Sequence, residues 1–222
     1  MLFGDLDDVV MTTVTTGNDR ILSGISGVQT LIGDVVTVTD GTLQAGHDLL
    51  DSRRLAGGRS VLTGDVDIAT VSTSLTSVDA GADRLYGSLT LGDTIVGDVR
   101  ELTGVLLEAG NDRIHGGGGN DRIYGDVAAA HGTDIGVSSG SFGVLNLEGG
   151  ADTLAGEDGN DLIYGDVGNF DDFTGSLRAR LQGNCDAISG GRGDDTIFGD
   201  AGSIVGIGNG GNDVIRGDAG ND

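Results

Sequence analysis

Short apolar segments alternate with turns rich in glycine and aspartate along almost the whole chain. The phrase G-x-D-x-(Ile/Leu), or a close variant, occurs twice in each of three 18-residue segments, which span residues 110–127, 150–167 and 184–201. Weaker copies lie upstream and near the carboxyl terminus, so that the units begin at residues 17, 46, 81, 110, 150, 184 and 211. Repetition of one unit along a chain predicts a solenoid in which each unit forms one coil.

Each unit is expected to contribute three short strands. Two follow the aspartates of the paired phrases, and the third is predicted in the linker, where VLLEAG (105–110) and RARLQG (178–183) alternate apolar and polar residues. The linker that follows the sequence GDV is expected to lie outside the stack. The Ile or Leu two residues after each aspartate should point inward and stack on its counterparts. These predicted core residues are Ile21, Leu50, Leu85, Ile114, Ile123, Leu154, Ile163, Ile188, Ile197 and Ile215.

The composition agrees with many short strands joined by tight turns. Glycine accounts for 44 of the 222 residues, and proline and tryptophan are absent. Helices tolerate so much glycine poorly. Hydrophobic residues make up 37% of the chain and are regularly spaced, which argues against a disordered protein. We therefore expect an all-β fold that forms a single repeat domain over residues 1–222.

The charge balance narrows the choice of partners. The chain carries 12 basic residues, all arginine, against 35 acidic ones, which gives a net charge of −23. Nucleic acid is therefore not an expected partner. No apolar run is long enough for a membrane span or a cleaved signal peptide, so we expect no membrane insertion. The single cysteine, Cys185, excludes an internal disulfide and a cysteine-rich zinc site.

The aspartates fall into rows that suit a hard divalent cation. Ca²⁺ takes six to eight oxygen ligands and tolerates irregular geometry, and turns of glycine and asparagine expose backbone carbonyls. The first aspartate of each pair is present in every unit, whereas Gln29 and Ser60 replace the second aspartate in the first two units. We expect fewer or weaker sites on that side before residue 90. The candidate ligands are Asp19, Asp48, Asp83, Asp112, Asp152, Asp186 and Asp213 in the first row, and Asp93, Asp121, Asp161, Asp195 and Asp222 in the second.

A third row of aspartates follows the glycine that closes each pair. Its members are Asp34, Asp65, Asp98, Asp126, Asp166 and Asp200. Two interpretations are open, because an aspartate at such a corner can bind calcium or accept a hydrogen bond that stabilises the turn.

The turn sequences resemble a known repeat. GGGGNDRIY (116–124), GGRGDDTIF (190–198) and GNGGNDVIR (208–216) are similar to the nonapeptide G-G-x-G-x-D-x-U-x of the RTX proteins, the hemolysin-type calcium-binding repeats. The resemblance implies an RTX-like β-roll: a right-handed parallel β-solenoid of about seven coils with variable linkers, which binds several Ca²⁺ ions and folds as it does so. It also places further residues of these turns in the metal sites, namely Gly116, Gly118, Asn120, Gly190, Arg192 and Asp194.

Neither end of the repeat shows a cap. The last unit, GNDVIRGDAGND (211–222), lacks a closing strand, and MLFGDL (1–6) resembles the missing strand. One hypothesis is head-to-tail self-association through Met1 to Leu6 and Gly211 to Asp222, with Asp222 as a ligand at the junction and Leu2 continuing the apolar ladder. The alternative is that these residues are a segment of a longer RTX protein.

We expect a calcium-binding, secreted structural protein of the bacterial cell surface, in a filament, surface layer or adhesive matrix. An enzyme is not expected, since no nucleophile, phosphate-loop or zinc signature occurs and the three histidines share no repeat position. The alternative function is an RTX module that assists secretion and folding of a larger toxin, adhesin or hydrolase. Ice or carbohydrate binding is a third hypothesis, suggested by the threonine-rich run VMTTVTTG (10–17).

Overall fold

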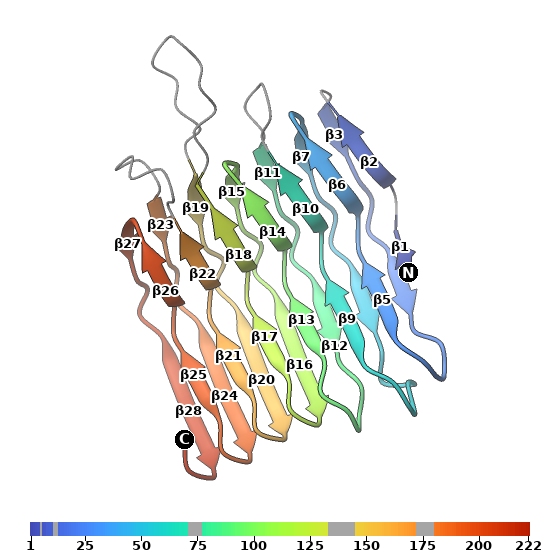
Figure 1. Ribbon diagram of the computed structural model, residues 1–222, viewed down its shortest axis with the longest axis vertical. Coiled ribbons are helices and arrows are strands. Elements are labelled where there is room, and N and C mark those ends of the chain that lie inside the picture. Colours follow the sequence, from blue (N-terminus) through green and yellow to red (C-terminus); the bar gives the residue numbers. More distant parts are fainter. Residues whose placement is uncertain (5, 11–12, 71–76, 133–144, 172–179) are drawn as a thin grey trace.

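The chain folds into a stack of parallel strands. The computed structural model describes residues 1–4, 6–10, 13–70, 77–132, 145–171 and 180–222, which form 28 strands and no helix. The strands assemble into four seven-stranded sheets, in which neighbouring strands pair in parallel. Figure 1 shows the coils stacked along one axis. The fold is thus the expected parallel β-solenoid, and none of its described residues lies in a helix that could cross a membrane.

The sheets are named A to D in the order in which the chain visits them. Sheet A contains β1 (Leu2–Phe3), β5 (Gln29–Ile32), β9 (Ser60–Thr63), β13 (Thr94–Val96), β17 (Arg122–Tyr124), β21 (Leu162–Tyr164) and β25 (Thr196–Phe198). Sheet B contains β2 (Leu6–Val10), β6 (Val35–Thr39), β10 (Val66–Thr70), β14 (Val99–Thr103), β18 (Val127–His131), β22 (Val167–Asp171) and β26 (Ala201–Val205). Sheet C contains β3 (Thr13–Thr15), β7 (Thr42–Gln44), β11 (Ser77–Asp79), β15 (Leu106–Glu108), β19 (Asn146–Glu148), β23 (Arg180–Gln182) and β27 (Ile207–Asn209). Sheet D contains β4 (Arg20–Leu22), β8 (Leu49–Asp51), β12 (Arg84–Tyr86), β16 (Arg113–Gly118), β20 (Thr153–Asp158), β24 (Ala187–Arg192) and β28 (Val214–Ala219).

Each of the seven coils has four strands, so the expectation of three strands per unit is wrong. The linker supplies two strands, because the segment that begins at the valine of GDV forms sheet B within the stack. These segments, such as VVTVT in β6 and VDIAT in β10, are rich in β-branched residues, which favour strands. Their first residues Val35, Val66 and Val99 are fully buried. Of the threonine-rich run, Met11 and Thr12 lie outside the described residues.

Two apolar cores run along the stack, and each lies between two sheets. One joins residues of sheets A and D, such as Leu50 and Leu62. The other joins residues of sheets B and C, such as Val66 and Leu43, and includes Phe170. A coil therefore has two lobes, an A/D lobe and a B/C lobe, which occupy the lower and upper parts of Figure 1. The narrow region between the lobes is called the waist below.

The predicted apolar ladder is present in the A/D lobe. Eight of its ten members are buried, and Ile197 packs against them. Ile215 pairs in register with Ile188 but is 47% exposed, because it belongs to the last coil. Leu2 pairs with Leu31 at the other end and thus continues the row.

Aromatic rings form short ladders on the outer faces of the A/D lobe. Tyr124 stacks on Tyr164 with ring centroids 5.2 Å apart, and Tyr164 stacks on Phe198 at 5.0 Å. Tyr86 stacks on His115 at 5.1 Å. Rings at the same register position in parallel strands lie one coil apart, and this spacing favours stacking.

Candidate metal sites

The three aspartate rows lie at three different corners of the coil. The first row lies where the chain passes from sheet C to sheet D, and the third lies where it passes from sheet A to sheet B. These two rows face each other across the waist, because the Gly81 amide beside Asp83 donates to Asp65 Oδ2 at 2.9 Å. The second row lies at the outer turns from sheet D to sheet A, the lower edge of the stack in Figure 1.

First-row aspartates form a ladder from coil to coil. The backbone amide of Asp83 donates to Asp112 Oδ1 at 2.8 Å, and the amide of Asp112 donates to Asp152 Oδ1 at 2.8 Å. The second carboxylate oxygen of each of these residues is buried and receives no hydrogen bond; the same holds for Asp186. The ladder thus orients one oxygen by an amide and leaves the other available to a further partner.

Third-row aspartates accept hydrogen bonds from glycine amides of the first-row turns across the waist, and not within their own corner. Asp126 accepts from the Gly150 amide at 3.1 Å, just as Asp65 accepts from Gly81. The other oxygen of Asp65 is buried without a hydrogen-bond donor. Carboxylate oxygens of the two rows come together, and two groups of three lie within 4.8 Å of one another: Asp19, Asp34 and Asp48, and Asp48, Asp65 and Asp83.

Second-row aspartates repeat the arrangement at the outer turns from Asp121 onward. The Asp121 amide donates to Asp161 Oδ1 and the Asp161 amide to Asp195 Oδ1, both at 2.8 Å. The Oδ2 atoms of these three residues are buried without a hydrogen-bond donor. The turns depend on glycine, since Gly117 and Gly119 have φ of 98° and 99°, a region that other residues rarely adopt. We call Asp121, Asp161, Asp195 and Asp222 the outer column.

The other predicted ligands of these turns lie beside the outer column. A Cβ on Gly156 would overlap both Asp161 Oδ2 and the carbonyl oxygen of Gly190, so this carbonyl faces the carboxylate. The carbonyl of Gly116 similarly faces Gly87. The Gly118 amide donates to the Ser88 carbonyl at 3.0 Å.

Side chains between these glycines make their own contacts along the surface. Asn120 Oδ1 accepts from the Asn160 amide at 3.0 Å, and Asp194 Oδ1 accepts from the Asn221 amide at 3.0 Å. Arg192 forms an ion pair with Asp158 at 2.8 Å. Arg192 has no side-chain acceptor, so it could contribute a ligand only through its backbone carbonyl.

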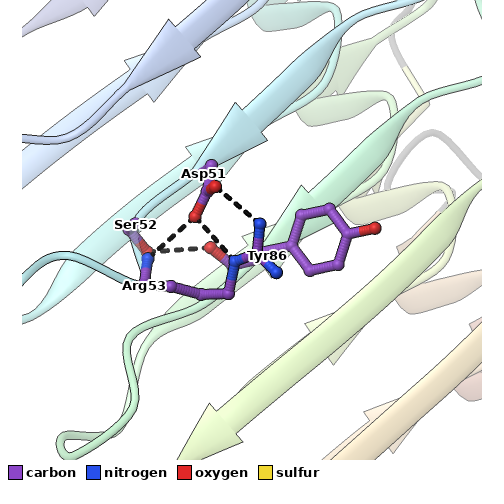
Figure 2. Close-up of polar contacts among 4 residues, drawn as sticks. All are labelled: Asp51, Ser52, Arg53 and Tyr86. Carbon is purple, nitrogen blue, oxygen red and sulfur yellow. Dashed lines mark hydrogen bonds and ion pairs between the residues drawn. The ribbon is translucent and has the colours of Figure 1, made fainter.

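The outer turn at residues 52–60 is closed by side chains. Ser60 occupies the second-row position, and its hydroxyl lies 2.8 Å from the hydroxyl of Ser52. Leu55 is buried in the same turn. Figure 2 shows Arg53 between Asp51, with which it pairs at 2.7 Å, and the ring of Tyr86, whose centroid lies 4.1 Å from the guanidinium carbon. The sequence indicates that the second-row carboxylate is missing at Ser60, but it does not indicate that Ser52 and Leu55 close the turn instead.

Asp93 differs from the rest of the second row. Its Oδ1 accepts from the Ser60 amide at 2.5 Å and its Oδ2 from the Ser88 amide at 2.6 Å. The turn at residues 87–93 contains one residue more than the turn at 116–121, which brings the Ser88 amide into this position. Both oxygens of the predicted ligand Asp93 therefore have amide donors, unlike those of Asp121.

Burial and mutual repulsion act on the carboxylates. Burial, with added repulsion from neighbouring aspartates, raises the pKa of Asp121 to about 8, that of Asp161 to about 6 and that of Asp186 to about 7. At the waist, burial first and the charge of Asp152 second raise the pKa of Asp112 and of Asp126 well above the usual range. Columns of this kind need bound protons or bound cations.

The donor set fits calcium. Among the described residues, the two groups of three whose ligand atoms lie close enough to share a metal contain aspartate only, and backbone carbonyls of glycine lie beside aspartate carboxylates of the rows. Hard oxygen donors without nitrogen or sulfur suit Ca²⁺ and Mg²⁺ rather than zinc or copper. His47 Nδ1 accepts from the Ala82 amide at 2.6 Å and His115 pairs with Glu157 at 2.8 Å, and neither histidine belongs to the two aspartate groups.

Comparison with known proteins gives one match. The family model described as the RTX calcium-binding nonapeptide repeat matches four times, at residues 108–127, 144–169, 186–203 and 206–222. Searches of curated proteins and of solved structures found no match to this chain. The matched segments contain the outer turns with unpartnered Asp121, Asp161 and Asp195 oxygens. The carboxyl-terminal half of the chain therefore contains RTX calcium-binding nonapeptide repeats.

Proposed function

We propose that the protein is a secreted, calcium-clamped structural element of a bacterial surface and not a catalyst. Calcium binding is inferred from one observation: columns of buried aspartate oxygens have no hydrogen-bond donor, such as those of Asp121 and Asp161. Cations between successive coils would neutralise these carboxylates and join the coils. Metal binding and folding would then be one process, and extracellular calcium sites commonly work near the millimolar range.

Calcium-dependent folding can be tested with a matched pair of variants. The metal-depleted chain should lose β-structure at pH 8 and regain it as CaCl₂ is titrated, as followed by far-UV circular dichroism and calorimetry. Asp161→Asn should weaken this response at least several-fold, because it removes a ligand of the outer column. Asp79→Asn is the control, since Asp79 lies exposed in sheet C. A metal-depleted chain that stays fully folded at pH 8 would contradict the calcium function.

The structural role is supported by the two ends of the stack. Each sheet ends in an edge strand at both ends, so a second copy can add one strand to all four sheets at once. The last coil exposes apolar residues, among them Val205 (52%), Val214 (51%) and Ile215 (47%). Stacking the first coil of one copy on the last coil of another would cover them. Such a contact does not close on itself and therefore gives filaments.

Electron microscopy and light scattering of the 222-residue chain test the assembly. With saturating Ca²⁺ we expect filaments that dissolve when the metal is removed. Ile215→Asp should block elongation because it places a charge in the junction, whereas Leu89→Asp, at a 59% exposed position in the middle of the stack, should not. Chains that bind calcium and fold but never elongate would reject the filament and favour a folding and secretion module of a larger protein.

A further inference from the structure

The waist differs chemically from the outer turns because two rows of aspartates meet there. It separates the two apolar cores. Asp65, Asp98, Asp126 and Asp166 of the third row have no exposed surface, and Asp83 of the first row is 1% exposed. Aspartates at such depth must be paired, protonated or bound to a metal. Among the described residues, basic side chains pair with Asp51, Asp67, Glu101, Glu157 and Asp158, all outside the waist.

One level of the waist shows a possible ligand set. Carboxylate oxygens of Asp48, Asp65 and Asp83 lie within 4.8 Å of one another. The Asp65 Oδ1 and Asp83 Oδ2 atoms are buried without a hydrogen-bond donor. The carbonyl oxygen of Gly64 lies beside Asp48 Oδ2, since a Cβ on Gly33 would overlap both atoms. Three carboxylates and a carbonyl are oxygen ligands of the type from which calcium sites are built, and bidentate carboxylates or water would complete the six to eight oxygens that Ca²⁺ takes.

The same arrangement repeats along the stack. The glycine that precedes each third-row aspartate lies against a first-row carboxylate, and a Cβ there would overlap it. This holds for Gly33, Gly64, Gly97, Gly125, Gly165 and Gly199. Asp112, Asp152, Asp166 and Asp186 each keep one buried oxygen without a hydrogen-bond donor. The recurrence of Gly-Asp at this corner therefore preserves both a carboxylate and the space beside it.

We propose that the waist holds a second, internal column of divalent cations, in which third-row aspartates are ligands together with first-row aspartates. This column extends through the coils whose outer turns lack a metal-binding carboxylate. The inference rests on the proposed calcium binding and adds to it the third-row ligands and the extent of the column. It also makes the two lobes of each coil depend on the same ions.

The two columns predict different numbers of ions. Seven first-row aspartates enclose six intervals between coils, and the four aspartates of the outer column enclose three. With one cation in each interval, the full chain should bind about nine Ca²⁺, against about three if only the outer column binds. Native mass spectrometry of the Ca²⁺-saturated chain counts the ions directly. A count of about three would overturn the internal column, and a count of zero would overturn the calcium function as well.

Variants assign the ions to the columns. Asp98→Asn removes a charge but keeps an oxygen that can accept the hydrogen bond from the Gly110 amide. This variant should bind at least one Ca²⁺ fewer than the unmodified chain, whereas the control Asp79→Asn should bind the same number. A quadruple Asp→Asn variant of the outer column (residues 121, 161, 195 and 222) should lose about three equivalents and retain the others. If this quadruple variant folds but binds no Ca²⁺, the internal column is rejected. If it does not fold, the ion count of the unmodified chain decides.

Discussion

At the scale of single residues, the glycine before each third-row aspartate is as constrained as the aspartate itself. A Cβ on Gly125 would overlap the carbonyl oxygen of Gly165 and the Oδ2 atom of Asp152. By contrast, no heavy atom lies within 4 Å of a Cβ placed on Gly57. Both residues belong to tight turns, but only Gly125 lies in the waist.

We therefore expect Gly125→Ala to destabilise the Ca²⁺-saturated fold by about 1 to 3 kcal/mol, as overpacking in a closed site does. Gly57→Ala should change the free energy of unfolding by less than about 0.5 kcal/mol, the usual range for an open surface position. Urea denaturation of both variants in excess Ca²⁺ measures the difference. Equal stability of the two variants would contradict the close packing of the waist.

The aspartate pKa values predict opposite pH responses with and without calcium. Burial and neighbouring carboxylates raise the pKa of Asp161 to about 6 and that of Asp121 to about 8, whereas aspartate in an unfolded chain has a pKa of about 3.9. The stability that protonation gives the metal-free fold is therefore complete below about pH 4 and is lost as the pH rises through 6 to 8. Calcium needs deprotonated ligands, so its affinity should rise over the same interval.

Circular dichroism between pH 4 and 9 can measure both responses, in buffer freed of metal by a chelating resin and in saturating CaCl₂. The metal-free chain should be more folded at pH 5 than at pH 8, and the Ca²⁺-saturated chain should remain folded at pH 8. A metal-free chain that gains structure as the pH rises would show that the carboxylates are not buried as described.

At the scale of elements, two contrasting kinds of outer turn share one position in the coil. The turn at 116–121 presents a buried carboxylate oxygen without a hydrogen-bond donor, whereas the turn at 52–60 is filled by Leu55 and closed by Ser52 and Ser60. The second kind is held by packing and neutral hydrogen bonds, and its stability should not depend on an ion.

Leu55→Ala should consequently destabilise the fold by about 2 to 5 kcal/mol, the range for a buried leucine, without changing the number of bound Ca²⁺ ions. Leu89→Ala is the control, because Leu89 is 59% exposed in the next outer turn. Thermal unfolding and ion counting on the same samples separate the two effects. A loss of calcium from folded Leu55→Ala would show that this turn also takes part in metal binding.

Much of the coil could be predicted from the sequence because its apolar and acidic positions repeat. The seven units and the inward ladder including Leu50 and Ile123 follow from one repeated phrase. Sheet B was missed because its strands follow an aspartate and precede linkers of unequal length, so they looked like connections. The pairing of Asp65 with Gly81 across the waist joins residues 16 positions apart, and no local pattern indicates it.

At the scale of the whole molecule, the solenoid is uneven along its axis. Its outer column begins at Asp121, while the outer turns before it end on Gln29, Ser60 and the amide-bonded Asp93. Coils of the carboxyl-terminal half should therefore depend on calcium at two corners, and coils of the amino-terminal half at one.

Hydrogen exchange during partial calcium removal tests this difference. The strand β17 follows Asp121 and is fifth in sheet A, and β9 follows the turn at 52–60 and is third among the seven, so both lie equally far from an end. Amides of β17 should lose protection at a higher free Ca²⁺ concentration than those of β9. If β9 and β17 lose protection at the same free Ca²⁺ concentration, the stack unfolds as a single cooperative unit.

The aromatic ladders give the stack an optical property. The chain has three tyrosines and no tryptophan, and each tyrosine stacks on a ring one coil away. The parallel rings of Tyr124, Tyr164 and Phe198 lie 5.2 and 5.0 Å apart and couple when excited, and they lose this coupling as soon as neighbouring coils separate. Near-ultraviolet dichroism of the unlabelled protein can therefore report contact between adjacent coils, while the far-ultraviolet signal reports the strands themselves.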